Sequence, residues 1–151
     1  MSNISFCKVA SKKDWKQFLD LEKVASQCSP YYLAFTNITE LKKFIGNSIV
    51  YLMFDGTKPI GHVEYEMKNK DSAEITGFVL SPDYRGQGLG KLLFGKAMDD
   101  LKNTKQVFLM THPENSKALK VYLAAGFVIK EWKDNYYGNG QPRLRLELNR
   151  K

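Results

Sequence analysis

One glycine-rich segment, Arg85-Gly-Gln-Gly-Leu-Gly-Lys91, constrains the fold of this chain more than any other feature of its sequence. It lies between an apolar stretch, 74–80, and a run of apolar residues at helical spacing, namely Leu89, Leu92, Leu93, Ala97 and Leu101. The segment therefore predicts a tight turn that joins a strand to a helix. A helix that begins there presents unpaired backbone N–H groups and the positive end of its dipole, which together suit a phosphate.

Two common phosphate-binding motifs do not fit this turn. A Walker A loop requires a glycine where Arg85 stands and a serine or threonine where Leu92 stands. The dinucleotide fingerprint G-x-G-x-x-G would place its third glycine at Lys91 or Leu93. A nucleoside triphosphatase and a Rossmann dinucleotide-binding protein are thereby excluded.

Turn and capping signals divide the rest of the chain into strand-like and helix-like pieces. Helices are expected to begin after Ser11, Asn37, Gly88 and Asn115. The second of these helices includes Ile45 and ends at Gly46 in this interpretation. Strands are expected at 4–9, 49–54, 60–67, 74–80, 106–111, 128–132 and 143–148. The predicted fold class is α/β, an open mixed sheet of about seven strands with helices on both faces.

Composition narrows the class of protein further. With 151 residues, of which 43% are hydrophobic, the chain is the size of one domain, 1–151, with its own core. No apolar run approaches the roughly 20 residues that span a bilayer, and the start of the chain lacks a signal-peptide pattern, so we expect a cytoplasmic protein without a membrane segment. The cysteines and histidines complete no zinc-ligand spacing, so no metal is expected. A net charge of +7 favours an anionic partner, either a phosphate-bearing cofactor or a nucleic acid.

Two motifs together resemble those of a known family. The pattern Arg85-x-x-Gly88-x-Gly90, preceded by Leu-Ser-Pro-Asp-Tyr at 80–84, resembles motif A of the GNAT family of acetyl-CoA-dependent N-acetyltransferases. The stretch 115–127, with Asn115, Tyr122 and the final Gly-Phe, is similar to motif B of the same family. The resemblance implies the GNAT fold, acetyl-CoA as the acetyl donor, and a primary amine as the acceptor substrate.

The resemblance also implies which residues hold the cofactor. The backbone N–H groups of Arg85, Gly86, Gln87, Gly88, Leu89 and Gly90 would bind the pyrophosphate of coenzyme A. The backbone of Phe78, Val79 and Leu80 would pair with the pantetheine arm, at a sheet edge that opens where two strands splay. Asn115 would be a further contact to the arm, although it can equally be read as a helix N-cap.

Tyr122 occupies the position from which members of this family donate a proton to the sulfur of coenzyme A. A phenol with a pKa near 10 and a thiol with a pKa near 8.5 differ by only about 2 kcal/mol, which a well-placed donor tolerates. The alternative is an aromatic residue that only packs beneath the sheet.

Glu74 is the first candidate for the group that takes the proton of the amine, because it resembles the glutamate of the histone-acetyltransferase branch. Direct transfer from an ammonium to an ordinary carboxylate is uphill by about 8 kcal/mol, so Glu74 would need a raised pKa or a water relay. Glu64 and Glu66 alternate with His62 along one strand face and are weaker alternatives.

The acceptor amine would lie between two loops, 29–37 and 133–142, with Tyr31, Tyr136 and Tyr137 as acceptor-binding residues. The second loop resembles that of N-terminal protein acetyltransferases such as the ribosomal-protein-alanine type, which implies a peptide α-amine. Met110, however, stands where that subgroup has a glutamate or a histidine. Lysine side chains and small-molecule amines therefore stay open as acceptors.

Two other functions on the same fold stay open: a non-catalytic acyl-CoA sensor and a basic nucleic-acid-associated module. The basic residues are scattered along the chain, and a pure binder would not require Tyr122, so catalysis is favoured and no nucleic acid partner is expected. Many members of the family pair, so a homodimer is a further expectation.

Overall fold

A computed structural model describes residues 3–29, 32–44 and 46–151. Seven strands form one sheet in the order β1-β2-β3-β4-β5-β7-β6. The strands are β1 (Ile4–Lys8), β2 (Ile49–Asp55), β3 (Lys58–Asn69), β4 (Ser72–Leu80), β5 (Gln106–Thr111), β6 (Val128–Lys133) and β7 (Arg143–Asn149). The helices are α1 (Lys12–Cys28), α2 (Ile38–Phe44), α3 (Leu89–Asp100) and α4 (Ser116–Ala124), with one 3₁₀ turn, η1 (Pro82–Tyr84). The predicted α/β class with an open mixed sheet is confirmed.

Both predicted capping boxes start helices. The backbone N–H of Asp14 donates to Ser11 Oγ, while the Asp14 carboxylate accepts from the backbone N–H of Ser11. At α2, the backbone N–H of Glu40 donates to Asn37 Oδ1 at 2.8 Å. The expected inclusion of Ile45 in α2 falls outside the described residues.

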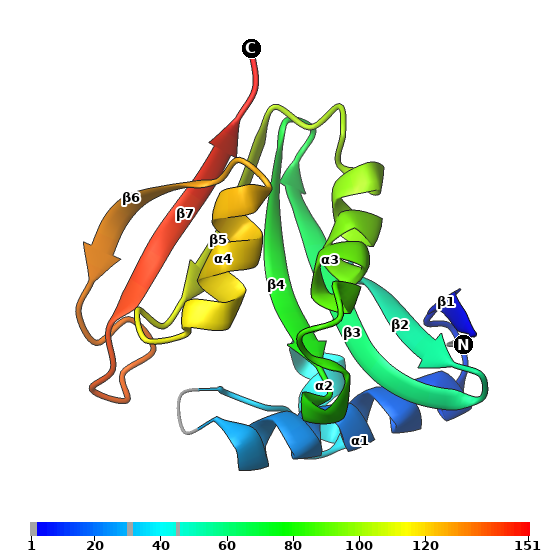
Figure 1. Ribbon diagram of the computed structural model, residues 1–151. Coiled ribbons are helices and arrows are strands. Elements are labelled where there is room, and N and C mark those ends of the chain that lie inside the picture. The colour runs from blue at the N-terminus through cyan, green and yellow to red at the C-terminus, as the bar shows by residue number, and fades with distance from the viewer. Residues whose placement is uncertain (1–2, 30–31, 45) are drawn as a thin grey trace.

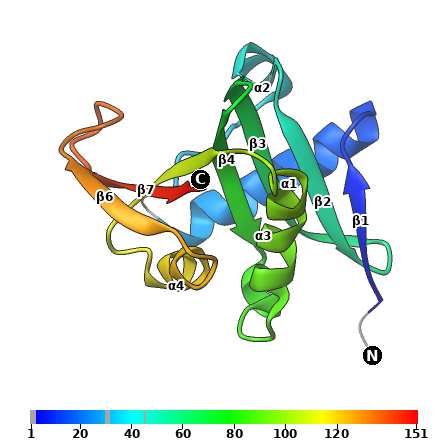
Figure 2. The ribbon, with the colours of Figure 1, turned by 90° about the horizontal axis from the view of Figure 1, so that it is seen from above.

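The helices lie on both faces of the sheet (Figures 1 and 2). Helices α3 and α4 cover one face, and α1 and α2 cover the other. The larger core cluster lies on the α3 side and includes Leu93, Phe94, Leu109, Phe127 and Leu146. A second cluster on the α1 side consists of Phe18, Leu21, Leu41, Val50 and Leu52. Burial of these apolar side chains on both faces holds the layers together.

The sheet opens between β4 and β5, which form its one parallel pair among the described strands. Their pairing covers only 72–75 of β4 and 106–109 of β5, ending at Ile75 and Leu109. β4 then continues to Leu80 without a partner on that side, and the two strands diverge below α3 and α4 in Figure 1. We refer to the gap beyond Ile75 and Leu109 as the opening.

A bulge in β4 lies at the level of the opening. Glu64 of β3 pairs with Gly77 and Tyr65 pairs with Ile75, so Thr76 is an extra residue on β4. A bulge bends its strand and increases the local twist. It therefore turns the end of β4 away from β5.

Candidate active site

The glycine-rich turn forms a concave row of backbone N–H groups at the start of α3. Gly86 and Gly88 have φ angles of +78° and +81°, which L side chains rarely adopt. The part of the chain that the structure describes offers no hydrogen-bond acceptor to the N–H groups of Gly86, Gln87 and Gly88. The first bond of α3 runs from the N–H of Leu92 to the carbonyl of Gly88, which leaves the preceding helical N–H groups free as well. Such a nest fits a phosphate or diphosphate.

The backbone N–H of Arg85, which was expected to bind the pyrophosphate, is not among the free N–H groups of the turn. Its N–H donates to the carbonyl of Pro82 at 3.3 Å, within the turn around η1, so it is already used. Its side-chain Nε donates to the carbonyl of Leu80 at 3.2 Å. The side chain of Arg85 thus ties the turn to the end of β4, and the free N–H groups begin at Gly86.

The expected arm-binding residues lie on the unpaired part of β4. Phe78 faces α3 and α4, where its ring lies 5.4 Å from that of Phe94. Val79 is buried, and the edge of β4 from Gly77 onward has no strand partner toward β5. Asn115 occupies the N-cap position of α4, but its side chain makes no capping hydrogen bond and is exposed. The amide of Asn115 therefore does not cap α4 and is open to solvent.

Tyr122 of α4 lies on the α3 side of the opening. Its side chain is 6% exposed and packs among the rings of Phe78, Phe94 and Phe127. Burial raises the pKa of Tyr122 above its usual value, so its hydroxyl is protonated at neutral pH. This residue belongs to the core and is also a candidate donor, so the two interpretations from the sequence do not exclude each other.

Three ionisable side chains meet on the α1 side of the opening. Glu22 of α1, His62 of β3 and Glu64 of β3 are 1%, 0% and 6% exposed. His62 Nε2 lies 3.8 Å from Glu22 Oε2, and both ring nitrogens of His62 lack a hydrogen-bond partner among the described residues. One carboxyl oxygen of Glu22 and one of Glu64 also lack a hydrogen-bond partner among the described residues. We call Glu22 and Glu64 the buried carboxyl pair.

The electrostatics of this group follow from its burial. Burial raises the pKa of Glu64 to about 7, with the nearby His62 acting against that rise and Glu22 adding to it. Tyr32, in the segment between α1 and α2, has its pKa raised by burial and by its proximity to Glu22 and Glu64. Tyr122 adds a smaller contribution to the raised pKa of Tyr32.

Glu22 and Tyr32 were not predicted as site residues. The missed signal for Glu22 is its position in α1, where it stands within the buried stripe formed by Phe18, Leu21 and Ala25. A carboxylate in an apolar helix stripe requires a partner or a function. The expected acceptor residue Tyr31 lies outside the described residues.

Glu74 lies away from the opening. It pairs with Phe108 in the closed part of the sheet, and its carboxylate forms an ion pair with Lys68 at 3.1 Å. Glu66 binds the same lysine at 3.2 Å. Both carboxylates therefore have a cationic partner.

The expected acceptor loop between β6 and β7 is closed by hydrogen bonds at its base. The backbone N–H of Gly140 donates to Asn135 Oδ1, and His112 Nε2 lies 3.1 Å from Gln141 Oε1. The other ring nitrogen of His112 accepts from the N–H of Glu114, so Nε2 carries the hydrogen and donates. Tyr136 and Tyr137 are exposed and pack edge to face, with centroids 4.7 Å apart.

Residues 13–127 match the acetyltransferase (GNAT) family. The chain belongs to this family. N-alpha-acetyltransferase 30 of Saccharomyces cerevisiae is 29% identical over 96 residues, which cover 60% of this chain and 54% of that protein. The putative [ribosomal protein bS18]-alanine N-acetyltransferase of Bacillus subtilis is 34% identical over 77 residues, or 49% and 51% of the two chains. The match spans about half the length of each relative.

The fold of this GNAT chain is also similar to a chain from the crystal structure of the NatC complex bound to Gag peptide and CoA. The TM-score is 0.80, with 22% sequence identity, and all of both chains is covered. Motif A of the GNAT chain forms the glycine-rich turn, and motif B forms α4 with Tyr122. The two motifs thus border the same opening.

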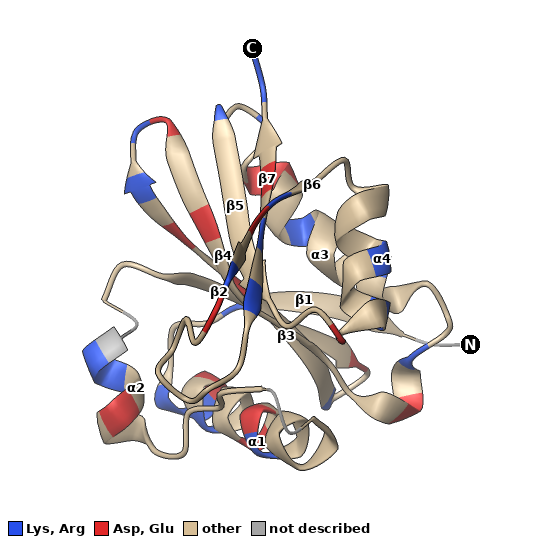
Figure 3. Cartoon of the chain, turned by 90° about the vertical axis from the view of Figure 1, so that its left-hand side faces the viewer, with Lys and Arg blue, Asp and Glu red and all other residues tan. Residues whose placement is uncertain are grey.

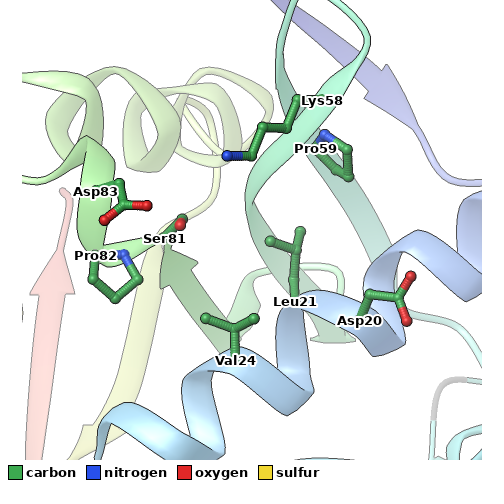
Figure 4. A pocket seen from close by; sticks show the side chains of 8 residues that line it. All are labelled: Asp20, Leu21, Val24, Lys58, Pro59, Ser81, Pro82 and Asp83. Atoms are coloured by element: carbon green, nitrogen blue, oxygen red, sulfur yellow. The ribbon is translucent and has the colours of Figure 1, made fainter.

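A surface pocket of about 370 Å³ lies between α1, the start of β3 and η1. Figure 4 shows the side chains that line it, namely Asp20, Leu21, Val24, Lys58, Pro59, Ser81, Pro82 and Asp83. It contains none of the residues expected to bind the cofactor.

Within the described residues, no group of three or more His, Cys, Asp or Glu side chains is placed to hold a metal ion. Over the same residues, none of the helices combines the length and apolar character required to cross a bilayer.

Proposed function

We propose that this chain is an N-acetyltransferase that transfers acetyl from acetyl-CoA to a primary amine. The observation that carries the proposal is the alignment of three features along one edge: a free N–H nest at 86–91, an unpaired end of β4, and buried Tyr122 beside that end. A nest suits the diphosphate, and an unpaired strand edge suits an extended amide-bearing arm. When bound, acetyl-CoA supplies an activated acetyl group as a thioester.

In this proposal the chain holds the cofactor mostly by main-chain groups. Gly86, Gln87, Gly88, Leu89 and Gly90 bind the diphosphate. The backbone of Phe78, Val79 and Leu80 and the amide of Asn115 hold the arm. Arg85 fixes the turn through Leu80 and adds a positive charge beside it.

Tyr122 is the proposed donor to the sulfur. Its raised pKa makes complete proton transfer to a thiolate more costly than for an ordinary phenol, whereas a hydrogen bond from the neutral hydroxyl still stabilises the departing sulfur. The proton of the amine needs an acceptor on the other side of the opening. The sequence suggested Glu74 for this role, either directly or through water.

A peptide α-amine is the proposed acceptor class, bound beside Tyr136 and Tyr137. Two observations support it: the relatives named above act, by their names, on α-amines or on a ribosomal-protein alanine, and the β6–β7 loop presents two exposed aromatic rings. A lysine side chain or a small polyamine is the alternative for the same site. A homodimer and a cytoplasmic location stay predictions from the sequence.

A thiol-release assay with acetyl-CoA and a panel of amines tests the function. The panel contains peptides with free α-amines, the same peptides with blocked α-amines and a free lysine, and spermidine. We expect release of coenzyme A with the free α-amines and a mass increase of one acetyl group on the peptide. Binding of acetyl-CoA without turnover of any amine would instead indicate an acyl-CoA sensor.

The nucleic-acid module is the remaining alternative. Figure 3 shows Lys and Arg distributed over several helices and strands, with Asp and Glu among them, rather than confined to one element. A dedicated nucleic-acid face would gather the basic residues. Tight RNA binding with a steep salt dependence and no turnover would favour the module over the enzyme.

A further inference from the structure

The buried carboxyl pair lies at the level where the sheet opens. Glu64 pairs with Gly77, just past the last β4–β5 pair at Ile75, whereas Glu74 lies before it. A Cβ atom on Gly77 would come within 2.6 Å of Glu64 Oε1, so the carboxyl group lies directly over that glycine. The glycine and the bulge at Thr76 together make room for Glu64 beside the unpaired end of β4.

The pair has unused hydrogen-bonding capacity. One oxygen of Glu22 and one of Glu64 have no partner within the described part of the chain, although both side chains are more than nine-tenths buried. Thr76 hydrogen-bonds Glu64 and Tyr32 hydrogen-bonds Glu22, but a buried carboxylate with one oxygen left without a donor is costly unless it takes up a proton or meets a cation. The orphaned oxygens therefore indicate a group that exchanges a proton or binds an ammonium.

Among the described residues, no lysine or arginine forms an ion pair with Glu64. The groups that face it are Glu22 from α1, His62 from its own strand, Thr76 from β4, and Tyr32, with Tyr122 of α4 acting on Tyr32. Glu74, by contrast, has Lys68 at 3.1 Å. Of these two carboxyl groups, only Glu64 lacks a lysine or arginine ion-pair partner among the described residues.

We propose that Glu64, rather than Glu74, accepts the proton of the acceptor ammonium, at the buried site that it shares with Glu22 and His62. This assignment rests on the proposed function. One N–H bond of the ammonium breaks, its proton goes to Glu64, and the electron pair stays on the nitrogen. The nitrogen then bonds to the acetyl carbon while the carbon–sulfur bond breaks. Tyr122 donates a hydrogen bond to the departing sulfur, the thiolate takes up the second proton released by the nitrogen, and Glu64 returns its proton to solvent.

The test compares Glu64→Gln with Glu74→Gln, which is the matched control because it makes the same change on the neighbouring strand. We expect the wild-type kcat to rise through about pH 7, where Glu64 loses its proton. Glu64→Gln should lower kcat at pH 7 by roughly 100-fold, and the loss should shrink as the pH approaches the pKa of the amine. Glu74→Gln should keep the wild-type profile, and coenzyme A affinity should be unchanged in both variants.

A second variant probes the pair itself. Because Glu22 raises the pKa of Glu64, Glu22→Gln should move the rising limb of the kcat profile to lower pH. The same shift should be seen directly, without turnover, in a ¹³C NMR titration of labelled glutamate carboxyls, with the signal near pH 7 absent from Glu64→Gln. If Glu64 had only a structural role, Glu22→Gln would not shift the pH profile of kcat.

The outcomes separate the two proposals. A wild-type chain that acetylates no amine overturns the proposed function, and this assignment with it. A wild-type chain that is active, while Glu64→Gln keeps its rate and pH profile or Glu74→Gln loses them, overturns the assignment alone. A carboxyl titration with no signal near pH 7 overturns it as well.

Discussion

The ring of Tyr122 lies 5.9 Å from the ring of Phe78, so the helix that carries the proposed proton donor touches the strand that carries the proposed arm-binding edge. This contact fixes the direction from which a hydroxyl can approach a sulfur lying along β4. It also places an ionisable residue within an aromatic cluster with Phe94 and Phe127.

Replacing Tyr122 by Phe should lower kcat by roughly 100-fold and leave coenzyme A affinity nearly unchanged, because only the donor is lost. Tyr65→Phe is the control, since Tyr65 is buried in the same core cluster but bonds Asp100. Steady-state kinetics and calorimetry of coenzyme A binding check the prediction. An unchanged kcat in Tyr122→Phe would restrict this tyrosine to packing.

Gly88→Ala should weaken coenzyme A binding by roughly tenfold. Gly88 has a φ angle of +81°, and a left-handed conformation costs an L residue about 1–2 kcal/mol, so the turn would leave its binding shape. The space around Gly88 is open, so a steric clash cannot be the cause. Calorimetry with coenzyme A measures the effect.

Gly95→Ala is the matched control for that prediction. Gly95 lies inside α3 with open space around its Cα and an ordinary φ angle, so alanine should stabilise the helix by up to about 1 kcal/mol. Its coenzyme A affinity should equal that of the wild type. If coenzyme A affinity fell equally in both variants, the cause would be a general effect on α3 and not the loss of the N–H nest.

The stability of the protein should depend on pH through Glu64. Its pKa is about 7 in the folded chain, against an ordinary 4.5, so the folded state binds the proton more tightly than the unfolded state between these values. The free energy of unfolding should therefore fall as the pH rises from about 4.5 to about 7, by up to about 3 kcal/mol. Urea unfolding of the wild type and Glu64→Gln at pH 5 and pH 8 isolates this contribution. A difference between the two proteins that is the same at both pH values would contradict it.

Gln141→Leu should raise the KM for the acceptor amine and leave coenzyme A affinity unchanged. The change removes the bond from His112 that anchors the loop with Tyr136 and Tyr137 to the end of β5. Gln106→Leu is the control, because Gln106 bonds Glu147 and Asn149 at the other end of the same strand. Initial rates over a range of amine concentrations distinguish the two, and an equal rise in KM in both would contradict a role for the loop.

The order of the strands and helices could be predicted from the sequence because each element carries a local signal. Glycines at 86 and 88 mark the turn, and the capping boxes at Ser11 and Asn37 mark two helix starts. The family motifs added the expectation of an opening beside β4. Strand ends were less exact: β3 extends from Lys58 to Asn69 rather than over 60–67, because the hairpin to β4 turns within two residues.

The buried carboxyl pair could not be predicted in the same way. Glu22 and Glu64 are 42 positions apart and meet only because α1 crosses the face of β3 that carries His62. The ion pair between Glu74 and Lys68 depends likewise on the register of two strands and on a side-chain conformation. No periodicity of a single segment encodes such contacts, so the sequence alone offered no reason to prefer Glu64 to Glu74.

The four residue pairs that join β4 to β5 are the only strand pairing between the two parts of the sheet among the described strands. A ligand that hydrogen-bonds along β4 and also contacts α4 would connect these two parts and hold them together. We therefore expect the occupied protein to resist heat, proteases and hydrogen exchange better than the empty one, above all in β5 and α4. The supply of the donor in the cell would then govern how long each copy of the protein survives, as well as how fast it works.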